Sequence, residues 1–216
     1  MALADASTML KSKLKIPKLS RLQRTNSTPK PSGWRRALQL LLALAVVLSL
    51  YVLYLQRVPA IKPLPENKQK EFISSVVEIP KVNRIIIPKI AVSSEIFSGN
   101  SSVLNKGSWH RYPDRGDPEQ GGNFIIAAHR YVVQWTPQRT VKQSVLYNIN
   151  VVTLGDKIFI DWNGKRIEYV VTETKTVKPN DSTIELSTST PQLTLYTCTL
   201  KGVNDGREVV IAKKIN

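Results

Sequence analysis

The sequence predicts an all-β domain, folded as a closed or nearly closed antiparallel barrel, that follows a single transmembrane helix. Three observations predict this fold class. Short β-branched and apolar runs recur between polar turns, at residues 84–90, 123–129, 156–162, 165–171, 193–198 and 208–215. The pair Asn163-Gly164 separates two of these runs, which is typical of a β-hairpin with a two-residue type I′ turn. A stretch of 19 uncharged, largely apolar residues lies near the N-terminus.

Composition indicates a folded protein and argues against a nucleic-acid-binding one. The chain is 42% hydrophobic and 22% charged, which is the balance of a globular domain. Its formal net charge of +15 is unevenly distributed, since nine of the 31 Lys and Arg residues precede position 37, where Asp5 is the only acidic residue. We therefore interpret the excess positive charge as a property of the N-terminal tail and predict no nucleic-acid partner.

The apolar stretch Ala37–Leu55 is predicted to be a retained signal anchor. Nineteen helical residues span roughly 28 Å, close to the thickness of a bilayer's hydrocarbon core. The stretch is longer than the apolar core of a cleaved signal peptide, and no small-x-small cleavage motif follows it. Because basic residues are denser before it than after it, the positive-inside rule places the N-terminus in the cytoplasm. We expect a single-pass protein of the cell membrane, in contact with the lipid bilayer, with its folded domain outside the cell.

These observations divide the chain into four predicted segments. Residues 1–36 are predicted to form a disordered basic tail and residues 37–55 the transmembrane helix. Residues 56–81 read as an extracellular stalk with a short helix near residues 71–78, because prolines and alternating charges dominate there. The folded domain is predicted to occupy residues 82–216.

The chain contains one cysteine, Cys198, at the end of the predicted strand 193–198. Outside the cell it has no partner in its own chain, so it is either packed in the core or kept free for chemistry. Leu193 and Leu195 share one face of the strand with Thr197, while Tyr196 and Cys198 share the other. This alternation favours a thiol that faces away from the main core.

A nucleophilic cysteine needs a base and a group that stabilises negative charge. A free thiol has a pKa of about 8.5, so a nearby histidine would be needed to hold the thiolate and move protons. Of the two histidines, His110 lies among turn residues, whereas His129 ends an apolar strand. Arg207 follows the turn 204–206, and a short loop between neighbouring strands would return it to Cys198. Each feature taken alone also has an ordinary structural explanation.

Together, these residues resemble the sortase family. The resemblance runs from about residue 85 to residue 215, through Ile87-Pro-Lys-Ile90, Leu104-Asn-Lys-Gly-Ser-Trp-His110, Gly121-Gly-Asn-Phe-Ile-Ile-Ala-Ala-His-Arg130, Leu193-Thr-Leu-Tyr-Thr-Cys198 and Arg207-Glu-Val-Val-Ile-Ala212. The segment ending at Cys198 is similar to the family's Thr-Leu-x-Thr-Cys signature. The chain departs from the family pattern at Ala128, where glycine is commoner, at Glu119-Gln120, and in having no proline just after Cys198.

The resemblance implies an eight-stranded barrel with short helices and a cysteine transpeptidase that needs no cofactor. Its substrates would be surface proteins with a Leu-Pro-x-Thr-Gly-like sorting signal, and its acceptor the amine of a peptidoglycan precursor or of a pilin lysine. Cys198 would form a thioacyl intermediate, His129 would transfer protons, and Arg207 would bind the oxyanion. The substrate groove would be lined by Asn123, Ala127, Tyr196 and Thr197.

Several alternatives stay open at this point. The linker before Arg84 has no aspartate-aromatic lid of the kind typical of pilin-polymerising members, so the sequence favours attachment of proteins to the cell wall. A binding barrel with a decayed site is disfavoured because all three reactive residues are present. An exported cysteine transpeptidase with a Ser-x-Gly-Cys motif does not match residues 197–199.

Two histidines and one cysteine offer no ligand-spaced metal cluster. Some sortases bind calcium, but Glu119, Asp181 and Glu185 are candidates by composition only, so no metal is predicted.

Overall fold

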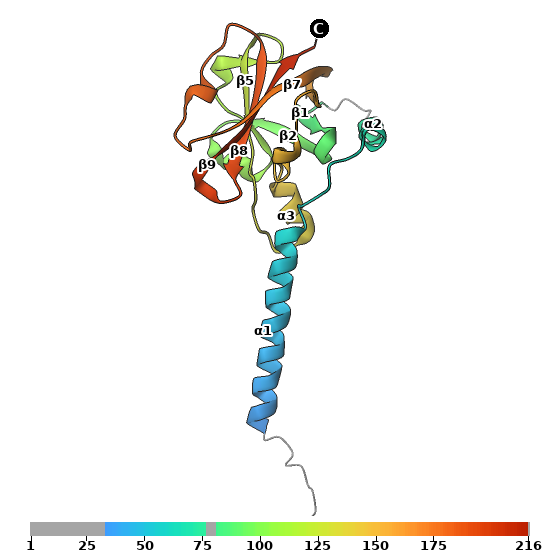
Figure 1. Cartoon of the computed structure of the whole chain (residues 1–216), viewed down its shortest axis with the longest axis vertical. Helices are drawn as coiled ribbons and strands as arrows, with labels where there is room; N and C mark the ends of the chain where they lie inside the picture. The colour runs from blue at the N-terminus through green and yellow to red at the C-terminus, as the bar shows by residue number, and fades with distance from the viewer. Residues whose placement is uncertain (1–32, 77–80, 216) are drawn as a thin grey trace, which may run out of the picture. The chain divides into compact units, whose positions relative to one another are not determined.

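The computed structural model describes residues 33–76 and 81–215 of the chain. Two helices come first, α1 (Gly33–Arg57) and α2 (Glu66–Ser75), and a third, α3 (Pro137–Gln143), lies between the strands (Figure 1). The strands are β1 (Arg84–Ile87), β2 (Val92–Ser98), β3 (Ser108–His110), β4 (Gly116–Asp117), β5 (Gly121–Ala127), β6 (Lys157–Trp162), β7 (Lys165–Val177), β8 (Gln192–Thr199) and β9 (Gly202–Lys214). Five short 3-10 helices connect them: η1 (Pro88–Ile90), η2 (Ser101–Asn105), η3 (Pro113–Arg115), η4 (Ile149–Val151) and η5 (Thr183–Glu185).

The two N-terminal helices refine the predicted boundaries. The predicted span 37–55 lies within α1, a helix of 25 residues that is long and apolar enough, by length and composition, to cross a membrane. The stalk helix was predicted at residues 71–78, but α2 begins at Glu66. Pro65 adopts an extended conformation as its N-cap, and Glu66 places negative charge in the first turn, which suits the helix dipole. Residues 77 and 78 of the predicted helix lie outside the described residues.

The strands close into a barrel of eight, which confirms the predicted fold class. Their order is β3-β2-β1-β6-β7-β9-β8-β5, and pairing of β3 with β5 closes the ring. The two-residue strand β4 adds to β5 outside it. The expectation that all pairs are antiparallel was wrong, because β2 pairs with β3, and β5 with β8, in parallel. A parallel pair needs a crossover connection, and the chain forms β6 and β7 before it returns from β5 to β8.

The hairpin predicted at Asn163-Gly164 is confirmed. Both residues have positive φ angles, 49° and 77°, as a type I′ turn requires. The turn joins β6 to β7, with Trp162 opposite Lys165. Asn and Gly tolerate this left-handed backbone better than other residues, which explains the choice of this pair.

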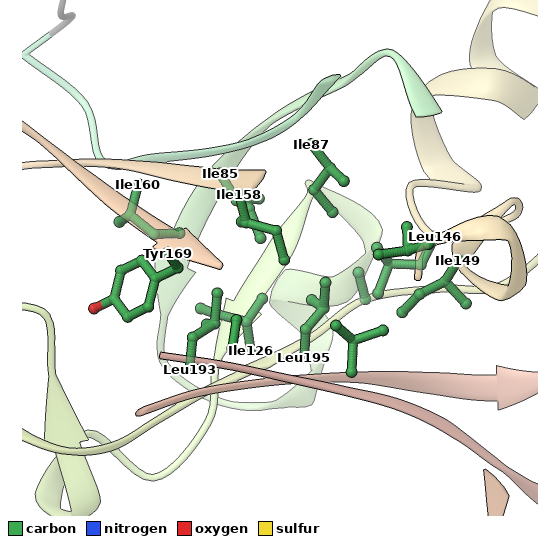
Figure 2. Close-up of a cluster of buried hydrophobic side chains, with 14 of the residues drawn as sticks. Ile85, Ile87, Ile126, Leu146, Ile149, Ile158, Ile160, Tyr169, Leu193 and Leu195 are labelled. Carbon is green, nitrogen blue, oxygen red and sulfur yellow. The ribbon is translucent and has the colours of Figure 1, made fainter. Parts of the chain in front are cut away.

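The main hydrophobic core fills the barrel interior. Alternate residues of the strands point inward, and Figure 2 shows Ile85, Ile126, Ile158, Leu193 and Leu195 among the buried side chains that meet there. The positions between them point outward, where Ile125, Ala127, Tyr196 and Val209 form a second, smaller cluster with Ile184 of η5. The outward position of Tyr196 agrees with the strand alternation inferred from the sequence.

His110 belongs to the interior core. It was expected in a loop, but it is the last residue of β3 and is 3% exposed. Its ring packs edge-on against Phe124, at 4.8 Å between centroids, and against Trp162, at 5.6 Å. Nε2 lies 3.1 Å from the carbonyl oxygen of Gly116, and burial lowers the pKa of the imidazole. His110 is therefore a structural residue of the barrel.

A buried carboxylate ties β1, the start of the barrel, to the hairpin of β6 and β7. Asp161 is fully buried, 2.7 Å from Arg84 Nη2 and 2.7 Å from Arg166 Nε. Burial alone would raise the pKa of Asp161, but hydrogen bonds and charge from Arg166 and Arg84 outweigh it and hold this pKa below its usual value. Arg166 also donates to the carbonyl of Val76, which anchors the chain that enters the domain.

We expect Asp161→Ala to destabilise the domain by about 3–5 kcal/mol, because it removes the buried partner of two arginines. The folded-state pKa of Asp161 is depressed, so its stabilisation is present above the unfolded pKa of about 3.9 and is lost as pH falls through the folded pKa. Urea unfolding of the full chain in detergent, followed from neutral to acidic pH, measures both effects. Glu173→Ala is the control, because the exposed pair with Lys175 is worth at most about 1 kcal/mol. Equal urea midpoints for the two variants would contradict this role.

Candidate active site

Cys198 lies near the end of β8, half-buried, and its thiol is free. Strand alternation puts it on the same outward face as Tyr196, while Leu193 and Leu195 belong to the interior core. On the neighbouring strand β9, Arg207 is the residue directly opposite Cys198. Directly opposed residues on antiparallel strands have Cα atoms about 4.5–5.5 Å apart, so the guanidinium and the thiol share one end of the sheet.

The short return from Cys198 to Arg207 contains an extended bulge. Thr199 pairs with Gly202, and the register then shifts so that residues 203–206 bulge out before Arg207 pairs with Cys198. Gly206 is needed in this bulge, since a Cβ atom there would come within 2.8 Å of the carbonyl oxygen of Val177. The proximity inferred from the sequence between Cys198 and Arg207 therefore depends on a local strand irregularity that the sequence did not predict.

Parallel pairing of β5 with β8 brings His129 level with Cys198. Ala127 is opposite Tyr196, and the backbone amide of Ala128 continues the ladder by donating to the carbonyl of Tyr196 at 3.3 Å. His129, two residues beyond Ala127, therefore corresponds to Cys198, two residues beyond Tyr196. The hydroxyl of Thr197 donates to the carbonyl of Ala128 at 2.7 Å and fixes this end of the two strands together.

The surroundings of His129 favour its neutral form. Burial lowers the pKa of the imidazole below its usual value of 6.5. Its Nε2 lies 3.4 Å from Asn105 Oδ1, a long hydrogen bond, and Gln143 in turn donates to the carbonyl of Asn105 at 3.2 Å. In the tautomer that donates from Nε2 to Asn105, Nδ1 carries the lone pair that can accept a proton. Asn105 orients the ring without adding charge. It lies in the segment 104–110 that carries part of the family resemblance, but sequence reasoning assigned it no role.

The guanidinium of Arg207 is oriented by the backbone of its own bulge. Nη1 donates to the carbonyls of Val203, at 2.8 Å, and Gly206, at 2.9 Å. Among the described residues, Nε and Nη2 have no protein hydrogen-bond acceptor. These donors are available to a bound anion or a polarised carbonyl, and the planar guanidinium suits such recognition.

An apolar floor extends from the three polar residues along the outer face of the barrel. Ala127, Tyr196 and Val209 belong to this second hydrophobic cluster, and Ile184 packs on it from the connection between β7 and β8. Ala127 and Tyr196 were assigned to the substrate groove from the sequence, and the structure places both beside the catalytic candidates on this face. The buried members of this cluster are at most 6% exposed, so they support the outer face beneath the connection between β7 and β8.

A polar network fixes the connection between β7 and β8 over this floor. The hydroxyl of Tyr196 donates to Glu185 Oε1 at 2.5 Å and accepts from Arg111 Nη1 at 2.7 Å, while Arg111 and Glu185 are paired at 3.1 Å. Arg115 Nη1 donates to the carbonyl of Glu185. Burial, together with Glu185, raises the pKa of Tyr196, so its phenol stays protonated.

The other two residues assigned to the groove make contacts within the fold instead. Asn123 is 1% exposed, and its Nδ2 donates to the carbonyls of Ile184, at 3.2 Å, and Leu186, at 2.7 Å. It lies on the correct face but six residues before His129, roughly 20 Å along the strand at about 3.3 Å per residue. Thr197 is 2% exposed and lies on the face of β8 opposite to the thiol. The structure thus brings neither side chain to Cys198.

A cavity of about 700 Å³ opens on the Asn105 side of His129. Its lining comes from the segment that follows α1, from β2, from residues 105–106, and from α3 with its flanking residues. Lys106, Arg139 and Lys142 bring positive charge to this lining, and Glu95 is its one acidic residue. The cavity is therefore predominantly cationic and reaches the residue that orients His129.

The acidic residues that were considered for calcium are engaged separately. Glu119 pairs with Lys165, Asp181 accepts from Thr183, and Glu185 belongs to the network with Tyr196. Within residues 33–76 and 81–215, no group of three or more His, Cys, Asp or Glu side chains is arranged to hold a metal ion.

Three comparisons relate this geometry to known proteins. The family model for the sortase domain matches residues 85–215. Sortase A of Listeria monocytogenes is 31% identical over 120 residues, which cover 54% of this chain and 49% of that protein, so the chain matches about half the length of this relative. Among solved structures, a pilus-related sortase C of group B Streptococcus has a TM-score of 0.54 at 28% identity, covering 63% of this chain and 68% of its own. A sortase D5 transpeptidase of Clostridium perfringens has a TM-score of 0.53 at 26% identity, covering 71% and 90%.

The match to the family model begins inside β1 and ends just after β9, so it spans the whole barrel with Cys198, His129 and Arg207. It covers more than half of the chain. The chain belongs to the sortase family.

Proposed function

We propose that this chain is a membrane-anchored cysteine transpeptidase that cleaves a Leu-Pro-x-Thr-Gly-like sorting signal and transfers the surface protein to an amine. The observation that carries the proposal is the row formed by Cys198 on β8, Arg207 opposite it on β9, and His129 two residues beyond the end of β5. A nucleophile, a proton carrier and an oxyanion donor at one point are the requirements of acyl transfer through a covalent intermediate. The complete set argues against a binding barrel with a decayed site.

Each residue has one role in the proposed first half-reaction. The thiolate of Cys198 attacks the carbonyl carbon of the threonine, and the negative charge passes to the carbonyl oxygen. Arg207 donates hydrogen bonds to this oxyanion. When the tetrahedral intermediate collapses, the bond to the glycine nitrogen breaks, and the imidazolium of His129 protonates the departing amine. A thioester to Cys198 remains.

The second half-reaction reverses these roles. An incoming amine attacks the thioester, neutral His129 accepts its proton, and the thiolate of Cys198 leaves. The lowered pKa of His129 supports this step, because a neutral imidazole is the form that accepts a proton.

The amine acceptor is proposed to approach through the cationic cavity next to Asn105. Its lysines and arginine favour an acceptor that carries negative charge, as a peptidoglycan precursor does, over a pilin lysine. We therefore favour attachment of proteins to the cell wall. The similar structures include sortases of both the A and the pilus-related C kind, so polymerisation of pilins is the second candidate.

We propose that α1 anchors the protein in the cell membrane with the barrel outside the cell. The support is the length and apolar composition of α1, together with the basic residues that precede it in the sequence. On this proposal, residues 1–36 are the cytoplasmic tail, residues 37–55 the span, residues 56–81 the stalk and residues 82–216 the catalytic domain.

We expect Cys198→Ala to abolish transfer and Arg207→Lys to impair it severely, because lysine keeps the charge but loses the planar set of donors. The measurement is mass spectrometry of products from a sorting-signal peptide library and a panel of amines. Lys201→Arg, an exposed change on the same hairpin, is the matched control and should keep full activity. Turnover by Cys198→Ala comparable to that of the unmodified chain would overturn the cysteine mechanism.

The two histidines should separate activity from stability. We expect His129→Ala to lose activity by about 10²–10⁴-fold or more, because general acid–base help and support of the thiolate disappear together. His110→Ala empties part of the core and should cost roughly 2–5 kcal/mol of stability, like other large-to-small core substitutions. Urea unfolding and rates normalised to the folded fraction distinguish the two effects. A folded but inactive His110→Ala beside an active His129→Ala would mean that the catalytic histidine is misassigned.

Protease treatment of intact protoplasts tests the membrane topology. With epitopes at both ends of the chain, the C-terminal epitope should be lost and the N-terminal one protected, because basic residues are retained in the cytoplasm. Protoplasts opened with detergent provide the control in which both epitopes are lost. Loss of the N-terminal epitope alone from intact protoplasts would reverse the proposed orientation.

A further inference from the structure

The segment that follows the catalytic histidine presents an exposed apolar surface. Trp135 is 87% exposed, the highest value among the large hydrophobic side chains of the described residues. Val133 and Val141 are 46% and 47% exposed beside it in sequence, on either side of the start of α3. We call residues 133–142 the Trp135 segment. An exposed tryptophan with two exposed valines on the same segment is the kind of apolar surface that marks an interaction site.

The Trp135 segment is rigidly built, so the exposure of Trp135 is a fixed feature. Thr140, which is fully buried, accepts from the amide of Gln134 at 3.0 Å, and its single hydroxyl proton lies within reach of the carbonyls of Thr136, at 3.0 Å, and Gln134, at 3.2 Å. Thr136 caps the N-terminus of α3, and Gln134 Nε2 donates to Gln143 Oε1 at 2.8 Å. These contacts hold the loop closed and leave the side chain of Trp135 exposed.

The same segment is bonded to the end of α1. The hydroxyl of Tyr51 donates to the carbonyl of Trp135 at 2.7 Å. Leu55 is 3% exposed, and Asn148 holds the chain just after α1 by donating to the carbonyl of Pro59 at 2.7 Å. Tyr51 lies six residues before the end of α1 at Arg57, or about 9 Å along the helix axis. In a membrane-spanning α1 this depth is at the boundary between hydrocarbon and headgroups, where tryptophan is enriched.

The charge of this region fits an anionic lipid surface. Residues 120–155 contain no Asp or Glu, and Arg139 and Lys142 are exposed on α3 next to Trp135. Basic residues near a bilayer that contains anionic lipid each add attraction at the headgroup level. An indole, two valines and two cations on a rigid loop form the combination of apolar insertion and basic rim found at membrane interfaces.

We propose that the Trp135 segment is a second membrane contact, in which Trp135 enters the lipid interface and Arg139 and Lys142 bind anionic headgroups. The inference rests on the proposed membrane anchor α1. The segment starts four residues after His129, so this contact holds the histidine side of the active site close to the bilayer. It restricts the enzyme to substrates presented at the membrane surface.

The experiment uses the full chain reconstituted in vesicles of phosphatidylcholine and phosphatidylglycerol. Cys198→Ala removes the single thiol, so one new cysteine can carry an environment-sensitive fluorophore. Val133→Cys reports on the Trp135 segment and keeps Trp135 in place. Ile215→Cys is the matched control, since Ile215 is 43% exposed and the chain ends at the opposite side of the catalytic domain from α3 in Figure 1. Leu48→Cys reports on insertion of α1.

We expect the label at position 133 to emit at shorter wavelength than the label at position 215 and to be quenched several-fold more strongly by lipids with nitroxide headgroups. Adding Trp135→Ser should remove most of this difference. Arg139→Gln with Lys142→Gln should remove its dependence on phosphatidylglycerol. Equal quenching at positions 133 and 215, with the Leu48→Cys label quenched by deep nitroxides, would overturn the second contact and leave the anchor intact.

Two further outcomes also decide the question. A Leu48→Cys label that lipid nitroxides do not quench would overturn the anchor, and the lipid contact with it. Shielding at position 133 that rises with the number of chains per vesicle, and not with anionic lipid, would assign the surface to a second copy of the chain. None of these readouts depends on turnover, so they are independent of the transpeptidase proposal.

Discussion

The register of β5, β8 and β9 is the constraint on which the active site depends. Parallel pairing of Ala127 with Tyr196 carries His129 to the level of Cys198, and antiparallel pairing of Cys198 with Arg207 adds the third residue. A shift of either strand by one residue would turn one side chain of the row to the opposite face. The hydrogen bond from Thr197 to the carbonyl of Ala128 therefore matters beyond its own strength, because it fixes β8 to the last peptide before His129.

The barrel separates stability from chemistry by using the two faces of the same strands. Inward positions hold the main core, which includes Leu193, Leu195 and the ring of His110. Outward positions carry the reactive groups and the smaller apolar floor. The connection between β7 and β8 covers that floor, and no second sheet does. The polar groups buried beneath this connection therefore need hydrogen-bond partners from within the fold. Glu185 and Arg111 provide them for the hydroxyl of Tyr196, and a buried charge left unpaired there would be costly.

The sequence predicts the parts of this arrangement that are local and misses those that depend on distant segments. The type I′ hairpin and the outward face of Cys198 follow from turn chemistry and strand alternation. The return of Arg207 was expected from a short loop, but its pairing with Cys198 depends on the bulge at residues 203–206. Parallel pairing of β5 with β8 is not local, and the placement of His129 came from the family resemblance. The same alternation put Asn123 on the correct face, but strand position and the covering connection remove it from the groove. His110 was read as a loop residue because turn residues follow it closely, although its own strand is only three residues long.

Arg207 and His129 have different tasks in the proposed reaction: Arg207 stabilises negative charge, and His129 transfers protons. No carboxylate hydrogen-bonds to the imidazole among the described residues, and burial lowers the pKa of His129, so the ring gains a proton mainly when negative charge appears beside it. Arg207 lies opposite Cys198, where its planar guanidinium can donate to the substrate oxygen as negative charge develops there. The guanidinium can therefore stabilise charge throughout the cycle, and the imidazole is left to change protonation state at each step. Asn105 fits this arrangement, because a neutral amide orients the ring without holding a proton on it.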